Sequence, residues 1–431
     1  MTKKKELYTY LYGLEKFGIL LGLDNIRIIL SLLGNPEKKF PSVHVVGTNG
    51  KGSTTVFLTS ILSKAGYRVG RYTSPHLINF SERITIGNKR ISERDIQRIA
   101  FMIRDRIAES KERERPYTFF EVTTAMAFQY FAEKNVDIAV IEAGLGGRLD
   151  ATNVLEPLVS VITNVGLEHR EFLGDTIEAI AEEKAAVIKN NRPVVTAAKD
   201  TALKVVERVA KLKESRVFAL GRDFYFKNHD MTHFDYRGIY KNFYGLRLKN
   251  LLGFNQFENA SLAIAAAENI MKRGFQISDA SLAQGIEEAR WEGRFEYIRK
   301  NPPFIVDGAH NSHGIESLIK NLNSFHPGSS FVIILNILRD KDIKEMVKFL
   351  EPFAEKFILV PNKNERSHTE AEYRNIFGTR ENFLFYSSIQ KALEEVIYSP
   401  AFADKPVLFT GSLYGVGEAK EYLRKHLQKL R

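Results

Sequence analysis

The residues in this chain whose types and spacing best suit a chemical role are Gly47-Thr48-Asn49-Gly50-Lys51-Gly52-Ser53. They follow the apolar run 43–46 and precede a segment, 53–65, in which apolar residues recur at helical spacing. Glycines let backbone N–H groups turn toward a ligand, a helix start adds positive potential, and a lysine neutralises phosphate oxygens. The spacing departs from G-x-x-x-x-G-K-[ST], because Gly52 separates Lys51 from Ser53. We predict a phosphate-binding loop rather than a plain glycine turn.

Polar clusters also follow three other apolar runs that are predicted to be strands. They are Thr73–Leu77, Glu142 with the segment 144–153, and Thr163–His169. The carboxyl ends of parallel strands share one edge of a sheet, and a hydroxyl, a carboxylate and an imidazole beside a triphosphate suit Mg²⁺. Taken singly, such a glutamate is often a salt-bridge partner and such a histidine a surface residue. Their position on the edge that carries the glycine loop favours a metal site.

Three further features are ambiguous from the residues alone. Helical periodicity around Lys184 makes it a solvated lysine on a helix face. The segment 307–311, Asp-Gly-Ala-His-Asn, follows a predicted strand and reads either as a turn or as the wall that closes the site. Residues 411–414, Gly-Ser-Leu-Tyr, follow the last predicted strand.

The elements that position these residues alternate between strand and helix, which predicts an α/β fold with a parallel sheet covered on both faces. The expected strands are 42–46, 68–72, 138–142, 159–163 and 194–197; the expected helices are about 6–33, 53–65, 92–109, 119–135 and 176–189. The aromatic stretch 224–248 predicts antiparallel strands, with its rings in sheet packing rather than in a stacking platform. Helices at 256–272 and about 280–290 close this unit.

A second strand–helix series begins after residue 294. Its expected strands are 304–307, 331–335, 357–360 and 407–410, and its expected helices are 313–324, 341–355, 388–398 and 415–429. We therefore expect a P-loop domain over 1–294 and a smaller, Rossmann-like α/β domain over 295–431. Two such domains in tandem place a cleft between them, where ligands of parallel sheets bind.

Composition limits the functional classes. With 62 basic and 52 acidic residues, the net charge is +10, which favours polyanionic partners. The basic residues are dispersed and no RNA-binding signature is present, so ATP and a polycarboxylate are expected rather than nucleic acid. The absence of cysteine excludes disulfides and thiolate catalysis. No apolar run is long enough to span a bilayer and no signal peptide is recognisable, so we expect a cytoplasmic protein without a membrane partner.

A family resemblance adds to this interpretation, because many motifs occur together in one order. The sequence resembles folylpolyglutamate synthase/dihydrofolate synthase of the Mur ligase superfamily over nearly its whole length. The motifs are Gly47–Ser53, Ser74–Leu77, Gly144–Asn153, Thr163–His169, Glu183–Ala185, Trp291-x-Gly-Arg294, Asp307–Asn311, Asp340–Asp342 and Gly411–Tyr414.

The resemblance implies ATP- and Mg²⁺-dependent addition of L-glutamate to folate, a folylpolyglutamate or dihydropteroate through an acyl phosphate. It implies two magnesium ions, one of them held through a carbamoylated Lys184, and we expect a monomer. By motif position, the implied nucleotide-binding residues are Thr48, Asn49, Gly50, Lys51, Gly52, Ser53, Asn259, Arg294 and Asp307. The implied metal ligands are Ser74, Glu142, His169 and Lys184, and the implied catalytic residues are Lys51, Lys184 and His310. The implied substrate residues are Phe120, Glu121, Leu149, Asp150, Ala151, Ser412 and Tyr414.

The chain departs from the family pattern at four positions. Glu168 replaces the usual aspartate before the metal-binding histidine, and Ala186 replaces a glycine after the modified lysine. Asn255 stands where a histidine is frequent, and Glu292 replaces the proline of Trp-Pro-Gly-Arg. None of these changes removes an implied metal ligand or phosphate contact, so they bear on specificity rather than on the reaction.

Two alternatives remain open at this stage. A cell-wall amino-acid ligase of the same superfamily usually carries an additional N-terminal domain, for which a P-loop at residue 47 leaves no room. A P-loop ATPase acting as a nucleic-acid- or partner-coupled switch would hydrolyse ATP without glutamate. The Ser74, Glu142 and His169 positions and the 307–311 segment favour the ligase. Whether dihydropteroate is a substrate is not decided by the residues.

Overall fold

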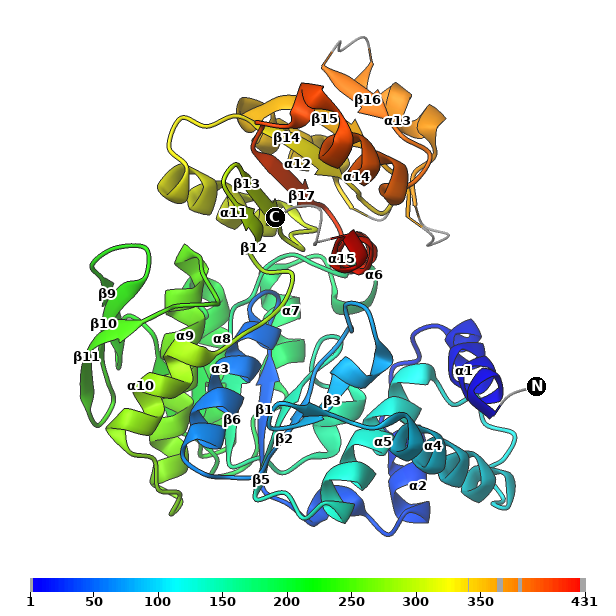
Figure 1. The fold of residues 1–431 in the computed structure, drawn as a ribbon. Coiled ribbons are helices and arrows are strands. Elements are labelled where there is room, and N and C mark those ends of the chain that lie inside the picture. The colour runs from blue at the N-terminus through cyan, green and yellow to red at the C-terminus, as the bar shows by residue number, and fades with distance from the viewer. Residues whose placement is uncertain (1–2, 340, 363–366, 379–381, 427–431) are drawn as a thin grey trace.

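The computed structural model describes residues 3–339, 341–362, 367–378 and 382–426, which form two lobes (Figure 1). The first lobe is built on an eight-stranded sheet of order β4-β3-β2-β5-β1-β6-β7-β8. Its strands are β1 (Ser42–Val46), β2 (Val69–Tyr72), β3 (Ile84–Ile86), β4 (Lys89–Arg90), β5 (Ile138–Glu142), β6 (Val159–Ile162), β7 (Val194–Thr196) and β8 (Val217–Ala219). Six strands are parallel, and β3 and β4 add an antiparallel edge next to β2.

Helices cover both faces of this sheet, as the buried strands require. One face carries α3 (Lys51–Lys64), α9 (Phe254–Met271) and α10 (Asp279–Glu288). The other carries α2 (Asp24–Leu32), α4 (Glu93–Ala108), α5 (Phe119–Glu133), α7 (Ile177–Ala185) and α8 (Asp200–Leu212). Side chains alternate between the two cores: Val45 packs with α3 and α9, whereas Val46 packs with α7 and α8. The fold class predicted from the sequence is confirmed.

The aromatic stretch forms a three-stranded antiparallel sheet, as predicted, of β9 (Tyr225–Asn228), β10 (His233–Arg237) and β11 (Asn242–Arg247). Phe234 and Tyr236 are fully buried against α9, so the rings serve packing. The carboxylate of Glu268 on α9 accepts hydrogen bonds from the hydroxyl of Tyr236 and from three backbone N–H groups of the 239–241 turn.

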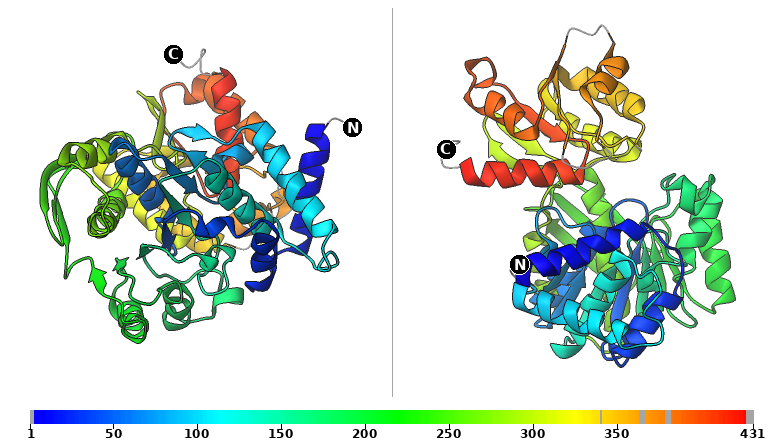
Figure 2. Two further views of the ribbon diagram at one scale, coloured as in Figure 1. Left: turned by 90° about the horizontal axis from the view of Figure 1, so that it is seen from below. Right: turned by 90° about the vertical axis from the view of Figure 1, so that its right-hand side faces the viewer.

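The second lobe contains a six-stranded sheet of order β12-β13-β17-β14-β15-β16. Its strands are β12 (Glu296–Lys300), β13 (Pro303–Val306), β14 (Phe331–Leu335), β15 (Ala354–Leu359), β16 (Phe383–Phe385) and β17 (Val407–Thr410). Its helices are α11 (Ser312–Phe325), α12 (Ile343–Leu350), α13 (Glu370–Phe377), α14 (Ile389–Tyr398) and α15 (Leu413–His426). Only β12 runs antiparallel to its neighbour among these described strands. The right-hand view of Figure 2 shows the two lobes as distinct bodies.

The predicted single helix over 6–33 is wrong. The chain instead forms α1 (Lys3–Gly13), a 3₁₀ turn (Leu14–Phe17), an irregular segment and then α2. Gly18 and Gly22 adopt φ values of +61° and +154°, which a helix interior does not permit. Six further features were not predicted from the sequence: α8, α13, the β3–β4 hairpin, β8, β12 and β16.

The remaining short elements are α6 (Arg170–Leu173) and 3₁₀ turns at Pro36–Lys38, Phe80–Arg83, Ala151–Val154, Glu351–Phe353 and Pro400–Phe402. Of the helices in the described ranges, none combines the length and the apolar character that crossing a membrane requires.

Candidate active site

The order of the central strands brings the predicted site residues to one edge of the sheet. Strands β2, β5, β1 and β6 are consecutive neighbours, and their carboxyl ends lead to Ser74, Glu142, the P-loop and Asn164 respectively. Residues far apart in the sequence therefore lie side by side, as expected for a parallel sheet. The backbone N–H of Ser74 donates to Glu142 Oε2 at 3.2 Å, which joins two of these strand ends directly.

The P-loop runs from β1 into α3 in a conformation that depends on glycine. Gly47 and Gly50 have φ values of +147° and +86°. A Cβ at Gly50 would lie 2.3 Å from Asn259 Oδ1, and one at Gly52 would lie 2.9 Å from Trp291 Nε1. These glycines allow α9 and the segment between the lobes to approach the loop closely.

The loop is held by hydrogen bonds from the segment after β6. Asn164 Oδ1 accepts from the backbone N–H of Asn49 at 2.8 Å, and Asn164 O accepts from that of Thr48 at 3.0 Å. The hydroxyl of Thr163 donates to Asn49 O at 2.6 Å, and Thr48 Oγ1 accepts from the N–H of Gly166 at 2.9 Å. The predicted segment 163–169 thus fixes the shape of the loop.

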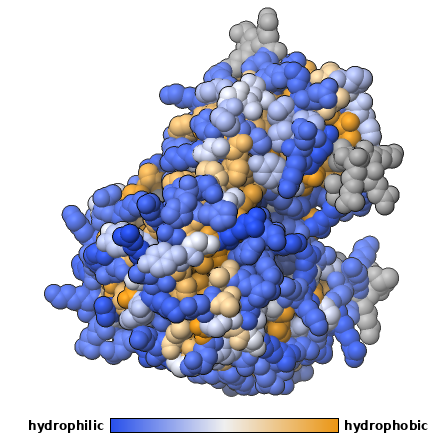
Figure 3. All heavy atoms as spheres, turned by 60° about the vertical axis from the view of Figure 1, so that its left-hand side comes forward, coloured by the Kyte–Doolittle hydropathy of each residue, from blue (hydrophilic) through white to orange (hydrophobic). Residues whose placement is uncertain are grey.

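A cavity of about 770 Å³ opens beside the loop and is lined by both lobes. Figure 3 shows the two lobes meeting on a largely hydrophilic face of the molecule. Seven of the predicted nucleotide-binding or catalytic residues line the cavity: Asn49, Gly50, Ser53, Asn259, Arg294, Asp307 and His310. Thr48, Lys51 and Gly52 belong to the same loop but are not part of this lining. Lys51 Nζ donates to Gly47 O at 2.8 Å and to Thr48 O at 3.0 Å.

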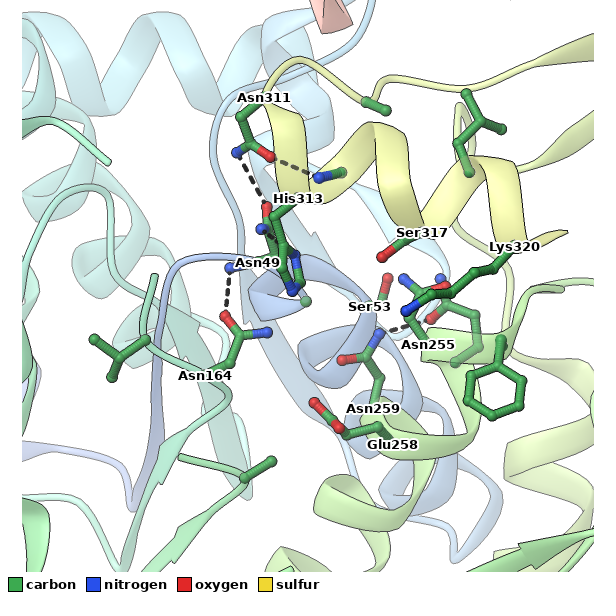
Figure 4. A pocket seen from close by; sticks show the side chains of 18 of the residues that line it. Asn49, Ser53, Asn164, Asn255, Glu258, Asn259, Asn311, His313, Ser317 and Lys320 are labelled. Carbon is green, nitrogen blue, oxygen red and sulfur yellow. Dashed lines mark hydrogen bonds between the residues drawn. The ribbon is translucent and has the colours of Figure 1, made fainter. Parts of the chain in front are cut away.

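Direct contacts across the cavity join the P-loop to the second lobe (Figure 4). Asn49 Nδ2 lies 3.1 Å from His313 Nδ1, and Asn311 Nδ2 donates to Asn49 Oδ1 at 3.4 Å. Figure 4 shows these side chains stacked between β1 and α11, with Asn259 facing them from α9. A ligand in this cavity would therefore contact both lobes at once.

A largely buried pair of opposite charges, Arg294 and Asp307, lies where the first lobe joins the second sheet. Burial raises the pKa of Asp307, and the positive charge of Arg294 opposes this rise. Burial likewise lowers the pKa of Arg294, and the negative charge of Asp307 opposes this fall. Asp307 also accepts hydrogen bonds from the backbone N–H groups of Phe295 and Ala309, at 2.7 and 2.8 Å. His310 Nδ1 lies 2.9 Å from Gly308 O, and burial lowers the pKa of His310 to about 4, so its imidazole is neutral at pH 7.

Ser74 and Glu142 form the best candidate for a cation site. Glu142 is 4% exposed, and burial raises its pKa to about 7 against the opposing effect of Lys51. A buried carboxylate of this kind is stabilised by a cation, and with a hydroxyl-bearing residue beside it the donors are the hard oxygens that Mg²⁺ prefers. His169 is exposed, and in the described part of the chain no hydrogen bond joins it to Ser74 or Glu142. Within the described ranges, no three His, Asp or Glu side chains come together as a group that could hold a metal ion.

Lys184 is buried, and the expectation of a solvated lysine from periodicity is wrong. Its side chain is 1% exposed, and Nζ lies 3.1 Å from Glu168 Oε1. Burial lowers the pKa of Lys184 to about 8. Burial raises the pKa of Glu168, but the positive charges of Lys51 and Lys184 outweigh this effect and hold the pKa at about 2. Glu168, which departs from the family pattern, is thus the partner of this lysine.

The predicted substrate residues on the α5 side lie together, and two of them have structural partners. Glu121 Oε2 accepts from the N–H and the hydroxyl of Thr118 in a capping box at the start of α5. Asp150 accepts from the N–H groups of Gly144 and Leu145, at 2.9 and 2.8 Å, and so shapes the loop after β5. The ring of Phe120 packs against that loop, since a Cβ at Gly144 would lie 2.6 Å from it.

For the other predicted substrate residues, the structure shows, over the residues it describes, their exposure but no contact that assigns them a role. Leu149 is partly exposed and Ala151 is buried beside Asp150. Ser412 is buried, with Oγ 3.4 Å from the N–H of Gly415, whereas Tyr414 is 44% exposed at the start of α15. Their roles stay predictions. Of the 340–342 motif, Asp340 lies outside the described residues.

Several cavity residues were not anticipated from the sequence. Asn164 binds the P-loop backbone, and His313, Ser317 and Lys320 line the cavity from α11 (Figure 4). Asp200 and Thr201, at the start of α8, form part of its far wall. Asp200 and Thr201 could have been found from the sequence, because they follow β7. The carboxyl end of this parallel strand lies at the same edge of the sheet as the P-loop.

Comparison with known proteins agrees with this arrangement. Residues 45–267 match the Mur ligase middle domain, and residues 293–413 match the Mur ligase glutamate ligase domain. The Bacillus subtilis dihydrofolate synthase/folylpolyglutamate synthase is 34% identical, over 98% of this chain and 100% of that protein. The Thermotoga maritima folylpolyglutamate synthase structure has a TM-score of 0.85 and 36% identity, covering 98% of this chain and 96% of that one.

A second solved structure, Escherichia coli FolC in complex with DHPP and ADP, has a TM-score of 0.88 and 28% identity and covers 98% of both chains. The two matched ranges take in the P-loop of the first lobe and all six strands of the second sheet, and they leave out the residues between 267 and 293 that precede it. The chain belongs to the folylpolyglutamate synthase/dihydrofolate synthase family of the Mur ligases.

Proposed function

We propose that this protein is an ATP-dependent ligase that joins L-glutamate to a reduced folate or folylpolyglutamate and releases ADP and phosphate. The observation that carries the proposal is the cavity in which the P-loop lies together with Arg294, at the junction of the lobes, and Asp307 of the second lobe. Family membership supplies the substrate class, since the relatives are named for folate and polyglutamate synthesis.

The proposed reaction has two steps. A carboxylate oxygen of the acceptor attacks the γ-phosphorus of ATP, the bond to the β,γ-bridging oxygen breaks, and an acyl phosphate and ADP result. The amine of glutamate then attacks the acyl carbon, the phosphate leaves with the original carboxylate oxygen, and the amine loses a proton. Such phosphoryl transfer depends chiefly on positioning and on neutralising charge.

The residues of this chain supply those two requirements. The backbone N–H groups of Gly50–Ser53 at the start of α3 bind phosphate oxygens, and Lys51 and Arg294 neutralise their charge. Asn259 and Asp307 hold the rest of the nucleotide. Neutral His310, with Nδ1–H donated to Gly308 O, keeps Nε2 as a hydrogen-bond acceptor at the cavity wall.

Ser74, Glu142 and His169 would hold one magnesium ion, and a carbamoylated Lys184 would supply the anionic oxygens for a second. Bound Mg²⁺ adds positive charge at the phosphate oxygens. The support is the buried Glu142 carboxylate beside Ser74 and the buried Lys184 amine, whose lowered pKa favours the neutral form that reacts with CO₂.

We further propose that the domains 1–294 and 295–431 close on the ligands and that the protein acts as a cytoplasmic monomer. Closure keeps water from the acyl phosphate. The contacts of Asn49 with His313 and Asn311 support this, because they already join the lobes at the cavity. The pterin-bearing substrate would approach from the α5 side, near Phe120, Leu149 and Ala151.

A second activity, the addition of glutamate to dihydropteroate, is favoured by two observations on relatives. The Bacillus subtilis relative carries both activities in its name, and the Escherichia coli structure contains DHPP. The acceptor would then present the carboxylate of its benzoate group to the same γ-phosphate.

Phosphate release with ATP, Mg²⁺ and glutamate tests the proposal, with dihydropteroate and tetrahydrofolate compared as acceptors and the product mass measured. We expect release that requires both glutamate and an acceptor, and a product heavier by one glutamyl residue. ATP hydrolysis that does not depend on glutamate, or that is stimulated by polynucleotide, would instead support the switch ATPase.

A further inference from the structure

A second region of the first lobe has the character of a binding site. Two cavities, of about 210 and 410 Å³, lie between α3 and the β2–β4 edge and share Arg71, Asn88 and Arg290. The smaller one begins at Ser74 and Glu142, so it adjoins the proposed reaction centre. The larger one continues along α3 to Lys64 and to Lys249. We call the two together the Arg71–Arg290 groove.

Hydrogen-bonding groups without partners concentrate in this groove. Thr59 and Thr85 are 4% and 1% exposed, and among the described residues neither hydroxyl has a hydrogen-bond partner. The same holds for Ser63 Oγ and for Arg71 Nε, which are also inaccessible to solvent. Native proteins rarely leave buried polar atoms unpaired, so four such atoms on two adjoining cavities indicate a ligand or ordered water. Thr59 and Ser63 lie one turn apart on α3 and face the larger cavity together.

The charges of the groove favour an anion. Its acidic groups are already paired: Glu82 with Arg90, Glu288 with Lys64, and Glu292 with Lys420 and Arg424. Glu142 accepts from the backbone of Ser74 and also acts electrostatically on Arg71. Lys249, which lines the larger cavity, is also paired, since its Nζ lies 3.8 Å from Glu287 Oε1.

Arg71 and Arg290, by contrast, form no ion pair within the described ranges. The guanidinium of Arg71 lies over the ring of Trp291, 5.4 Å from its centroid, and is thereby held in place. Arg290 is exposed at the junction of the two cavities. Two arginines that form no ion pair among the described residues, and that both line the two cavities, suit a ligand with more than one carboxylate.

We propose that the Arg71–Arg290 groove binds the γ-linked glutamyl tail of polyglutamylated acceptors. Its arginines would face the tail carboxylates, and Thr59, Ser63 and Thr85 would bond the tail amides. This rests on the proposed function and deepens it. An acceptor with a long tail ends in the carboxylate that must reach the γ-phosphate, and its earlier glutamyl residues need a place beside that point. The groove starts at the reaction centre and offers repeated cationic and hydroxyl groups.

The kinetic test compares acceptors that carry one and five glutamyl residues. For Arg290→Met, we expect KM to rise at least tenfold for the pentaglutamate and to stay within twofold for the monoglutamate, with kcat unchanged. Thr59→Val, which keeps the side-chain shape, should raise the same KM about threefold. Arg113→Met, at an exposed arginine in the 111–115 loop, is the control and should change neither KM. Equal changes for both acceptors, or none, would overturn the proposal.

Binding of penta-γ-glutamate without a pterin, measured by calorimetry on the whole protein, does not depend on catalysis. We expect binding that Arg71→Met weakens at least tenfold. Arg216→Met is the matched control, because Arg216 likewise lies over a ring, 4.6 Å from the centroid of Phe218. Displacement of the peptide by an equal concentration of phosphate or free glutamate would indicate an adventitious anion site and contradict the proposal. Failure of the proposed function would appear separately, as no extension of either acceptor.

Discussion

Lys184 Nζ lies 3.1 Å from Glu168 Oε1, and the lysine side chain is 1% exposed. A buried ammonium is costly unless it is paired, and a single carboxylate satisfies only part of its hydrogen-bonding capacity. Burial has lowered the pKa of Lys184 to about 8, which brings the amine close to its neutral form. The pair therefore has the features of a functional site rather than of a surface ion pair.

We predict that Lys184 takes up CO₂ as a carbamate. Protein equilibrated with ¹³C-bicarbonate should show one carbamate resonance in its ¹³C spectrum, and Lys184→Met should abolish it. The same variant should lose on the order of 100-fold in kcat, because the anionic group at this position is gone.

Lys211 serves as the control for that experiment, since it is an exposed lysine on α8. Lys211→Met should keep both the resonance and the activity. A wild-type protein with full activity and no carbamate signal would rule out the modification.

A second prediction concerns Gly50, where a Cβ would lie 2.3 Å from Asn259 Oδ1. Gly50→Ala should weaken ATP binding at least tenfold, measured by calorimetry, because the P-loop and α9 must move apart. Gly66→Ala is a matched control: Gly66 has a similar φ, +92° against +86°, but open space around it. Both changes carry the cost of about 1 kcal/mol for a left-handed alanine, so only the clash separates them. Equal ATP affinities for the two variants would contradict the close approach.

A third prediction concerns Lys51, the cation of the P-loop. Lys51→Ala should reduce glutamate-dependent phosphate release by about 100-fold or more, because the charge that neutralises the phosphates is lost. The circular-dichroism spectrum should be unchanged, since Lys51 Nζ bonds only to carbonyls of its own loop among the described residues. Near-normal turnover by this variant would disprove the phosphate assignment.

A fourth prediction concerns acid stability and His44. This residue is fully buried, Nε2 lies 2.8 Å from Thr152 Oγ1, and Thr152 Oγ1 in turn donates to Asp150. Nε2 is therefore the donor, and burial lowers the pKa of His44 to about 3. The unfolded chain, with a pKa of about 6.5, binds the proton first as pH falls. The free energy of unfolding should thus drop below pH 6.5 by up to about 1.4 kcal/mol per pH unit from this residue.

Urea unfolding at pH 7 and pH 5 checks this. His44→Asn should be less stable than wild type at pH 7 but should lose less stability between the two pH values. An identical pH dependence for His44→Asn and wild type would contradict the neutral buried imidazole.

Much of the site was predictable because it depends on local sequence and on the rules of parallel sheets. The P-loop, Ser74 and Glu142 each follow a short apolar strand, and strands β2, β5, β1 and β6 bring them to one edge. Asp307 and His310 follow β13 in the same way and line the shared cavity.

What was not predictable depends on tertiary structure. The burial of Lys184 follows from the close approach of α7 to the loop after β5, where a Cβ at Gly147 would lie 3.1 Å from the Cα of Lys184. Helical periodicity does not reveal such a contact. The break between α1 and α2 arises where Gly18 and Gly22 take positive φ, although the flanking residues have a helical composition. Glu121 and Asp150 turned out to bond backbone N–H groups, a role that a motif match does not reveal.

The most direct test of the central claim is the fate of the acceptor's carboxylate oxygen. Folate labelled with ¹⁸O in its γ-carboxylate is incubated with the enzyme, ATP, Mg²⁺ and glutamate, and the released phosphate is analysed by mass spectrometry. Attack of that carboxylate on the γ-phosphorus predicts one ¹⁸O atom in each phosphate. Phosphate free of ¹⁸O, with glutamyl product formed, would contradict the acyl phosphate and the placement of the acceptor beside the P-loop.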